Sequence, residues 1–72
     1  MKEEQWIECR VSPGMFRDER VVEVSGRSFF VDEKSVRKEQ GHFEVLVTII
    51  QTNGHKRAVL PTRLSESIEL GA

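Results

Sequence analysis

A long apolar segment followed by an Asn-Gly pair constrains the fold of this chain more than any other feature. The segment runs from Phe43 to Thr52, and Asn53-Gly54 separates it from a second β-rich run that ends before Pro61. A two-residue type I′ turn needs positive φ at both central positions, which Asn-Gly adopts at low steric cost. The sequence therefore predicts an antiparallel hairpin in which Lys56–Leu60 returns along the long strand. Proline then ends the pairing, because it has no N–H to donate.

Length and charge limit the classes of protein to which the chain can belong. With 72 residues it makes a single domain, 1–72, around one small core. Its acidic and basic residues are interspersed and sum to −1, whereas a nucleic-acid binder of this size usually carries a basic excess. The single cysteine permits no internal disulfide, which favours a reducing cytosol. No apolar run approaches the roughly 20 residues of a membrane span, so we expect a cytoplasmic protein with no membrane partner.

Apolar and polar residues alternate in three further segments. Gln5–Val11 alternates with period two and is broken by Ser12-Pro13-Gly14, where a turn or loop is expected. Glu19–Val24 and Arg27–Asp32 flank Ser25-Gly26 and predict a second hairpin.

The segment from Asp32 to Gln40 is the least β-like part of the chain. It is polar apart from Val36 and stops at Gly41. It is compatible with one helical turn that begins at Asp32 and ends at the glycine, or with a solvated loop. We favour a short turn followed by a loop.

The C-terminal segment has two spacings. Leu64 and Ile68 are spaced as on a helix, whereas Ile68 and Leu70 are spaced as on a strand. A 3₁₀ turn over residues 63–65, followed by a last strand at Ser67–Leu70, satisfies both. The apolar faces of all these segments give the predicted core: Ile7, Cys9, Val11, Val22, Val24, Val31, Val45, Val47, Ile49, Val59, Leu64 and Ile68.

The order of these elements resembles that of small SH3-like β-barrels. Residues 60–64, Leu-Pro-Thr-Arg-Leu, followed by Ser67–Leu70, are similar to the strand, 3₁₀ turn and closing strand of such barrels. Ser12–Arg20 would be the long loop after the first strand. The resemblance covers nearly the whole chain and implies an all-β, antiparallel, five-stranded SH3-like barrel. It implies no function, since this superfold has many, and the chain lacks the tyrosines that line grooves for proline-rich peptides.

Exposed apolar side chains make protein binding the function that the sequence favours. Met15 and Phe16 follow a Pro-Gly turn, where they either anchor a partner or fold back to plug one end of the barrel. Phe29 and Phe30 are adjacent in a strand, so one faces the core and the other is exposed or covered by the next segment. We predict a non-enzymatic binding or adaptor domain. Its predicted partner-binding residues are Met15, Phe16, Arg17, Arg20 and Phe30.

Two alternatives stay open, namely a weak RNA- or DNA-binding barrel and self-association into a homo-oligomer through edge strands. No cofactor, catalytic residue or metal ligand is expected. Cys9 lies on an apolar face as an inert thiol, and His42 and His55 flank opposite ends of the long strand, too far apart to share a metal. The residues of the nucleic-acid alternative are Arg17, Arg20, Lys56, Arg57 and Arg63.

Overall fold

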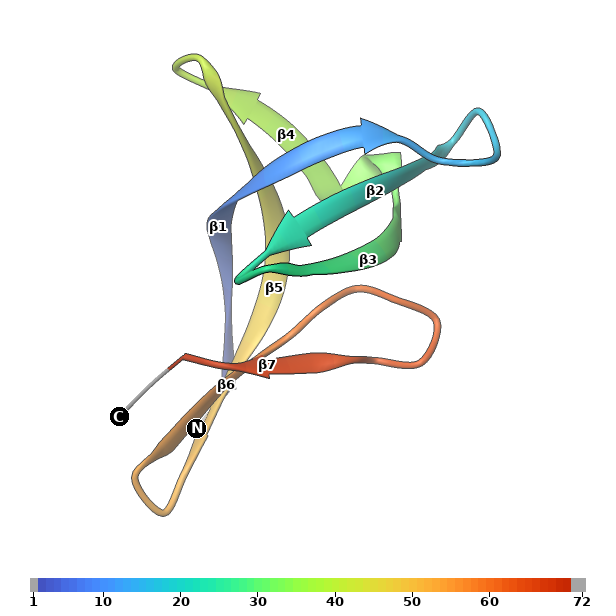
Figure 1. Ribbon diagram of the computed structural model, residues 1–72. Coiled ribbons are helices and arrows are strands. Elements are labelled where there is room, and N and C mark those ends of the chain that lie inside the picture. The colour runs from blue at the N-terminus through green and yellow to red at the C-terminus, as the bar shows by residue number, and fades with distance from the viewer. Residues whose placement is uncertain (1, 71–72) are drawn as a thin grey trace.

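The computed structural model describes residues 2–70, which form a curled antiparallel sheet of seven strands (Figure 1). The strands are paired in the order β3-β2-β1-β5-β6-β7, and β4 also pairs with β5. The predicted all-β, antiparallel class is confirmed. The strands are β1 (Lys2–Pro13), β2 (Glu19–Val24), β3 (Arg27–Asp32), β4 (Val36–Glu39), β5 (His42–Thr52), β6 (His55–Val59) and β7 (Ser67–Glu69).

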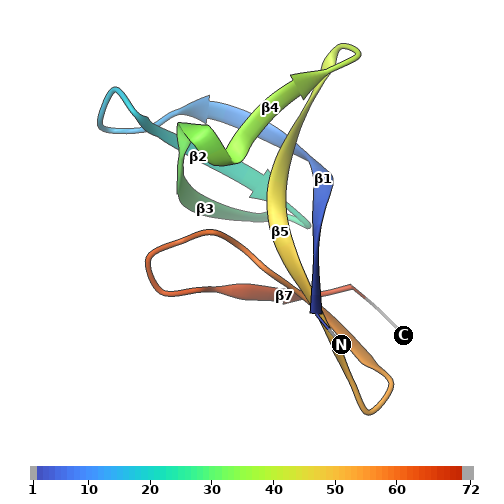
Figure 2. The same cartoon turned by 180° about the vertical axis from the view of Figure 1, so that it is seen from behind.

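Two long strands carry the sheet around the core. Residues 2–9 of β1 pair with β5, whereas residues 10–13 pair with β2, so β1 passes from one part of the sheet to the other. The bend between these halves is visible from both sides (Figures 1 and 2). On its other edge, β5 pairs first with β4 and then with β6. The sheet therefore curls, and the core lies inside the curl.

Three hairpins are closed by two-residue turns in which both central residues have positive φ. The pairs are Ser25-Gly26 (52° and 76°), Gln40-Gly41 (49° and 88°) and Asn53-Gly54 (49° and 78°). This geometry is that of a type I′ turn, whose twist matches that of the flanking strands. The first and third turns are those that the sequence predicts. The second joins β4 to β5, so Gly41 ends no helix.

The segment after β3 follows the sequence-based prediction only in its first part. The predicted short turn is present as a 3₁₀ helix at Glu33–Ser35. Asp32 caps it, because its Oδ1 accepts a hydrogen bond from the N–H of Lys34 at 2.8 Å. The chain then forms β4 where we expected a loop. Within residues 2–70 the structure has seven strands, whereas the predicted barrel has five. Pairing with β5 stabilises β4, and a polar four-residue strand gives no strong periodic signal.

A turn precedes β7, as predicted, but it is a single hydrogen-bonded turn and is not extended into a 3₁₀ helix. The Ser65 N–H donates to the carbonyl of Thr62 at 3.0 Å, and this closes a turn where a 3₁₀ turn over residues 63–65 was expected. Leu60, directly after β6, donates its N–H to the carbonyl of Glu66 at 2.7 Å. Residues 60–66 form what we call the β6–β7 segment. The bond between Leu60 and Glu66 brings its two ends together.

The core differs from its prediction mainly around β6. Ala58 lies opposite Ile49 and points inward, so its neighbour Val59 faces outward and is only half-buried. Leu64, also predicted in the core, is 81% exposed because the turn directs it to solvent. Leu60 is buried instead, and so are Ala58 and Phe29, which the prediction left out. The buried core comprises Cys9, Val22, Val24, Phe29, Val31, Val45, Val47, Ile49, Ala58, Leu60 and Ile68, with Ile7, Val11 and Val36 packed against it.

Candidate functional site

The loop between β1 and β2 (residues 14–18, the β1–β2 loop) is built around Glu19. The N–H of Gly14 donates to the Glu19 carbonyl at 3.1 Å, and the N–H of Met15 donates to its side-chain Oε1 at 2.8 Å. A Cβ on Gly14 would lie only 2.7–2.8 Å from atoms of Glu19, so this close approach requires glycine. The tight closure leaves Met15 83% exposed and Phe16 67% exposed. The expectation that they plug the barrel is therefore wrong.

Strand β3 adds a second exposed aromatic residue. Phe29 is buried and Phe30, facing the other way, is 55% exposed, as the alternation of a strand requires. Phe30 lies opposite Val21 of β2, on the outer face of the sheet. The segment from Asp32 to Gln40 therefore does not cover it.

A groove of about 600 Å³ joins these separate residues. The β1–β2 loop contributes Phe16 and Asp18, β3 contributes residues 30–32, and the β6–β7 segment contributes Pro61 and Arg63. Met15 precedes the groove residue Phe16 in the chain, and Leu64 follows the groove residue Arg63. Four of the six large apolar side chains exposed among the described residues, Met15, Phe16, Phe30 and Leu64, thus belong to segments that form the groove. Phe16 and Phe30 line the groove itself, so this is the place where exposed aromatic side chains gather.

The groove is acidic. Asp18, Glu19 and Asp32 line it, and Arg63 is the cation beside them. Glu19 and Asp32 are direct neighbours across the β2–β3 pair, an arrangement in which like charges repel. The sequence-based analysis did not find Asp18, Asp32 or Pro61, because only the sheet order places them together.

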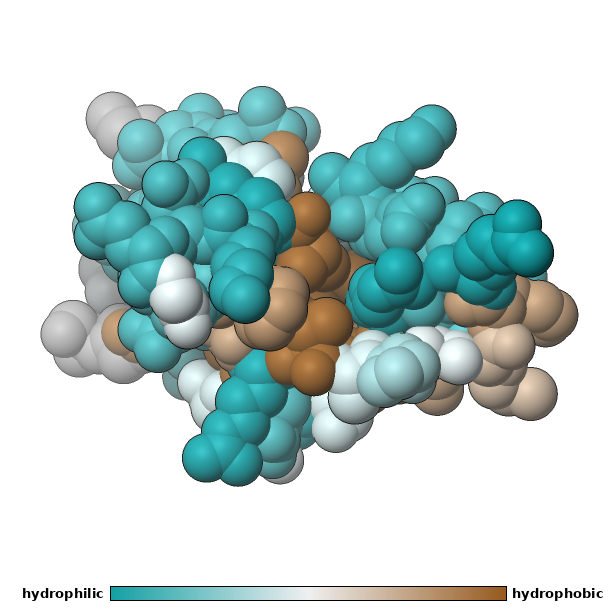
Figure 3. Space-filling model, turned by 90° about the horizontal axis from the view of Figure 1, so that it is seen from above, coloured by the Kyte–Doolittle hydropathy of each residue, from teal (hydrophilic) through white to brown (hydrophobic). Residues whose placement is uncertain are grey.

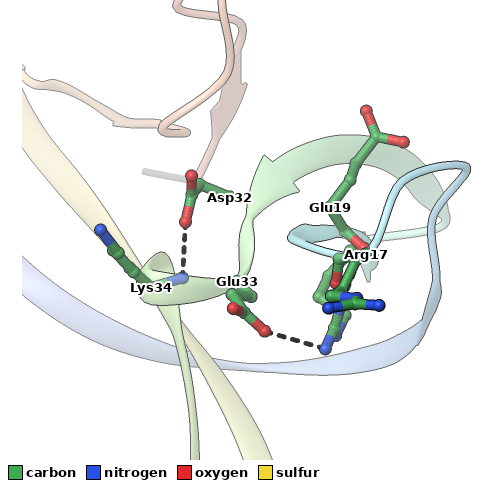
Figure 4. A network of polar contacts seen from close by, with 6 residues as sticks. Arg17, Glu19, Asp32, Glu33 and Lys34 are labelled. Carbon is green, nitrogen blue, oxygen red and sulfur yellow. Dashed lines mark hydrogen bonds and ion pairs between the residues drawn. The ribbon is translucent and has the colours of Figure 1, made fainter.

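Arg20 stabilises the loop from inside. Its guanidinium donates to the carbonyls of Arg17 and Glu19 at 2.7 and 2.9 Å, and pairs with the Glu33 carboxylate at 3.0 Å. Figure 4 shows the Glu33 carboxylate turned toward the side of Arg17 and Glu19. The side chain of Arg20 is one-third exposed. The sequence predicts that Arg17 and Arg20 both contact a partner. In the structure, the guanidinium of Arg20 holds the β1–β2 loop in place.

The basic residues of the nucleic-acid alternative lie in two regions: Arg17, Arg20 and Arg63 belong to the segments around the groove, and Lys56 and Arg57 to β6. Arg57 lies on β6, where it donates to Ser67 Oγ at 2.9 Å and pairs with Glu69 at 3.4 Å. The β5–β6 hairpin that carries Lys56 and Arg57 points away from the β1–β2 loop (Figures 1 and 2). Arg63 alone lines the groove, among carboxylates. The structure thus divides the five residues among separate regions.

A second furrow lies over β1 and β4. Its lining includes Val11, Val36 and Phe43, with Arg37 and Lys38 at its border. Seen from above, strongly apolar side chains lie at the bottom of a furrow flanked by hydrophilic ones (Figure 3). Both cations already rest on rings: the Arg37 guanidinium is 4.4 Å from the centre of the Trp6 ring, and Lys38 Nζ is 5.7 Å from that of Phe43.

The nucleophilic and metal-ligating side chains form no reactive cluster. Cys9 is buried, and burial together with the nearby carboxylates of Glu44 and Glu8 raises its pKa to about 11, which keeps the thiol protonated at neutral pH. His42 Nε2 lies 3.3 Å from a Glu44 oxygen. Within residues 2–70, no three His, Cys, Asp or Glu side chains are placed to hold a metal ion, and no helix is long and apolar enough to span a membrane.

Comparison with known proteins finds no match for this chain among protein-family models, curated proteins or solved structures.

Proposed function

We propose that the chain is a non-enzymatic adaptor domain that recruits another protein through the groove between the β1–β2 loop, β3 and the β6–β7 segment. The observation that carries this proposal is the gathering of Phe16 and Phe30, both more than half exposed, in one groove. Aromatic side chains dominate the energetics of protein interfaces when a partner buries them. A monomer gains nothing from exposing them.

The proposed fold type is the SH3-like small barrel. A first strand, a hairpin, a long central strand, a tight hairpin and a short closing strand support it, in that order along the chain. The loop after β1 is shorter than the predicted Ser12–Arg20, because β1 extends to Pro13 and β2 begins at Glu19. The additional strand β4 precedes β5 and leaves this order intact. The fold type adds nothing to the functional proposal, which rests on the groove alone.

The test is affinity capture from source-cell lysate with the full chain and two variants. Phe16→Ala/Phe30→Ala removes both groove rings, whereas Phe43→Ala removes a ring that is exposed outside the groove. We expect a defined protein that survives nuclease treatment and moderate salt to be captured by the wild type and by Phe43→Ala. The double variant should lose it while it keeps its thermal stability, because exposed rings contribute little to folding.

Two outcomes would contradict the proposal. One is equal capture by all three proteins, which would leave the groove without a role. The other is retention of nucleic acid alone, eluted at low salt, which would favour the nucleic-acid alternative and its arginines.

A further inference from the structure

We propose that the groove takes its partner by strand addition, in which an extended segment with adjacent apolar residues and a Lys or Arg pairs with the free edge of β3. The inference rests on the proposed function and deepens it, since it specifies the mode of binding and the chemistry of the partner segment. Exposed strand edges accept such segments because they offer a row of backbone N–H and C=O groups.

The edge of β3 is open along the groove. Within residues 2–70, β3 pairs with β2 alone and ends the sheet. Three consecutive β3 residues, Phe30 to Asp32, line the groove, so it follows the strand edge rather than crossing it. On the opposite side, Pro61 has no N–H and the N–H of Thr62 already donates to the Leu60 carbonyl at 2.8 Å. The β6–β7 segment therefore leaves the β3 edge unpaired (Figure 1).

The alternation of β3 specifies which side chains an added strand should carry. Phe30 and Asp32 lie on the outer face, whereas Val31 between them points inward and is buried. Neighbouring strands place their side chains in register on each face. The partner residue beside Phe30 should be apolar, and so should the next one, which faces inward beside Val31. The residue after that lies beside Asp32.

Charge decides the residue beside Asp32. Asp18, Glu19 and Asp32 place three carboxylates in the lining of the groove, and Arg63 is the cation beside them there. Glu19 Oε1 accepts from the Met15 N–H and Asp32 Oδ1 from the Lys34 N–H, so each carboxylate uses one oxygen in the local structure. A Lys or Arg of the partner would pair with the remaining oxygens, whereas an acidic residue would be repelled by the excess of carboxylates in the groove. The partner segment is therefore apolar and basic.

The experiment selects a phage-displayed library of random octapeptides against the full chain. We expect enriched peptides to carry two adjacent apolar residues followed or preceded by Lys or Arg. Asp18→Asn/Asp32→Asn should weaken a synthetic enriched peptide about 2–5-fold, as expected for exposed ion pairs, and added salt should do the same. The control Glu3→Gln/Glu4→Gln makes the same change of charge on β1, away from the groove, and should leave affinity unchanged.

N-methylation of the enriched peptide tests the backbone pairing itself. Every second N–H of an added strand points to β3, so methylation at alternate positions should lower affinity about tenfold or more, and methylation between them should not. Selection of neutral or acidic peptides would overturn the proposal of a basic segment. Equal loss of affinity on N-methylation at every position would overturn strand addition. If such peptides still require Phe16 and Phe30, the adaptor function stands. Self-association of the chain in place of peptide binding would identify a second copy as the occupant and overturn the inference.

Discussion

At the scale of single residues, Glu44 is a charged group held by two neighbouring side chains. Its carboxylate pairs with the guanidinium of Arg37 at 2.8 Å and lies 3.3 Å from His42 Nε2. The hydrogen bond from Arg37 lowers the pKa of Glu44 against the opposing effect of desolvation, and the hydrogen bond from His42 adds to the lowering. Because Arg37 also lies over the Trp6 ring, Glu44 keeps three side chains on the outer face of β1, β4 and β5 in place.

The lowered pKa predicts how the stability of the fold depends on pH. The folded-state pKa lies below the ordinary value near 4.5, so the ionised carboxylate stabilises the fold above that pH and loses this contribution as pH falls through the folded-state pKa. Urea unfolding at about pH 6.5 and about pH 3 should show a larger loss of stability for the wild type than for Glu44→Gln. The exposed Glu4→Gln is the control and should follow the wild type. Equal losses in the wild type and Glu44→Gln would contradict the prediction.

At the scale of elements, the sequence predicts hairpins where the turn residues themselves accept positive φ. Asn53-Gly54 and Ser25-Gly26 stand between apolar runs, so both turns follow from local chemistry. Gln40-Gly41 is not found this way, because glutamine has no local preference for positive φ and the strand before it contains only one apolar residue. Pairing with β5 determines β4, and such non-local pairing leaves no pattern in the segment itself.

Exchange of the first turn residue tests this account of the hairpins. Gln40 has a φ of 49°, which asparagine adopts more readily, so Gln40→Asn should stabilise the fold by about 0.5–1 kcal/mol. Asn53 has the same φ, and Asn53→Gln should destabilise it by a similar amount. Chemical denaturation of the two variants measures both changes. Effects of the same sign would show that side-chain contacts, rather than backbone conformation, govern these turns.

At the scale of the whole molecule, the candidate site is a product of sheet order. The sequence names Met15, Phe16 and Phe30 as candidate partner-binding residues, each from its own local pattern, and leaves their exposure open. It cannot place them beside Pro61 and Arg63, because the groove requires β3 at one end of the sheet to lie against the segment between β6 and β7. The same long-range arrangement determines which leucine of that segment enters the core.

The burial of Leu60 and Leu64 is the reverse of the sequence-based prediction, which places Leu64 in the core and leaves Leu60 out. Leu60 is 1% exposed and joins the core, whereas Leu64 is 81% exposed, although the helical spacing of Leu64 and Ile68 suggests a buried position. Leu60→Ala should cost about 2–5 kcal/mol through lost burial and a residual cavity. For a domain of this size, with a total stability of roughly 4–11 kcal/mol, that loss removes a large fraction of the free energy of unfolding.

The matched variant Leu64→Ala removes the same atoms from an exposed position, so its effect should stay within about 0.5 kcal/mol. Thermal and urea unfolding of both variants measure the contrast. A larger loss for Leu64→Ala would mean that the β6–β7 segment turns its other side to the core, and the groove beside Pro61 and Arg63 would then not exist. Because the two leucines lie four residues apart in one segment, their relative cost tests the closure of the fold and the shape of the proposed binding site together.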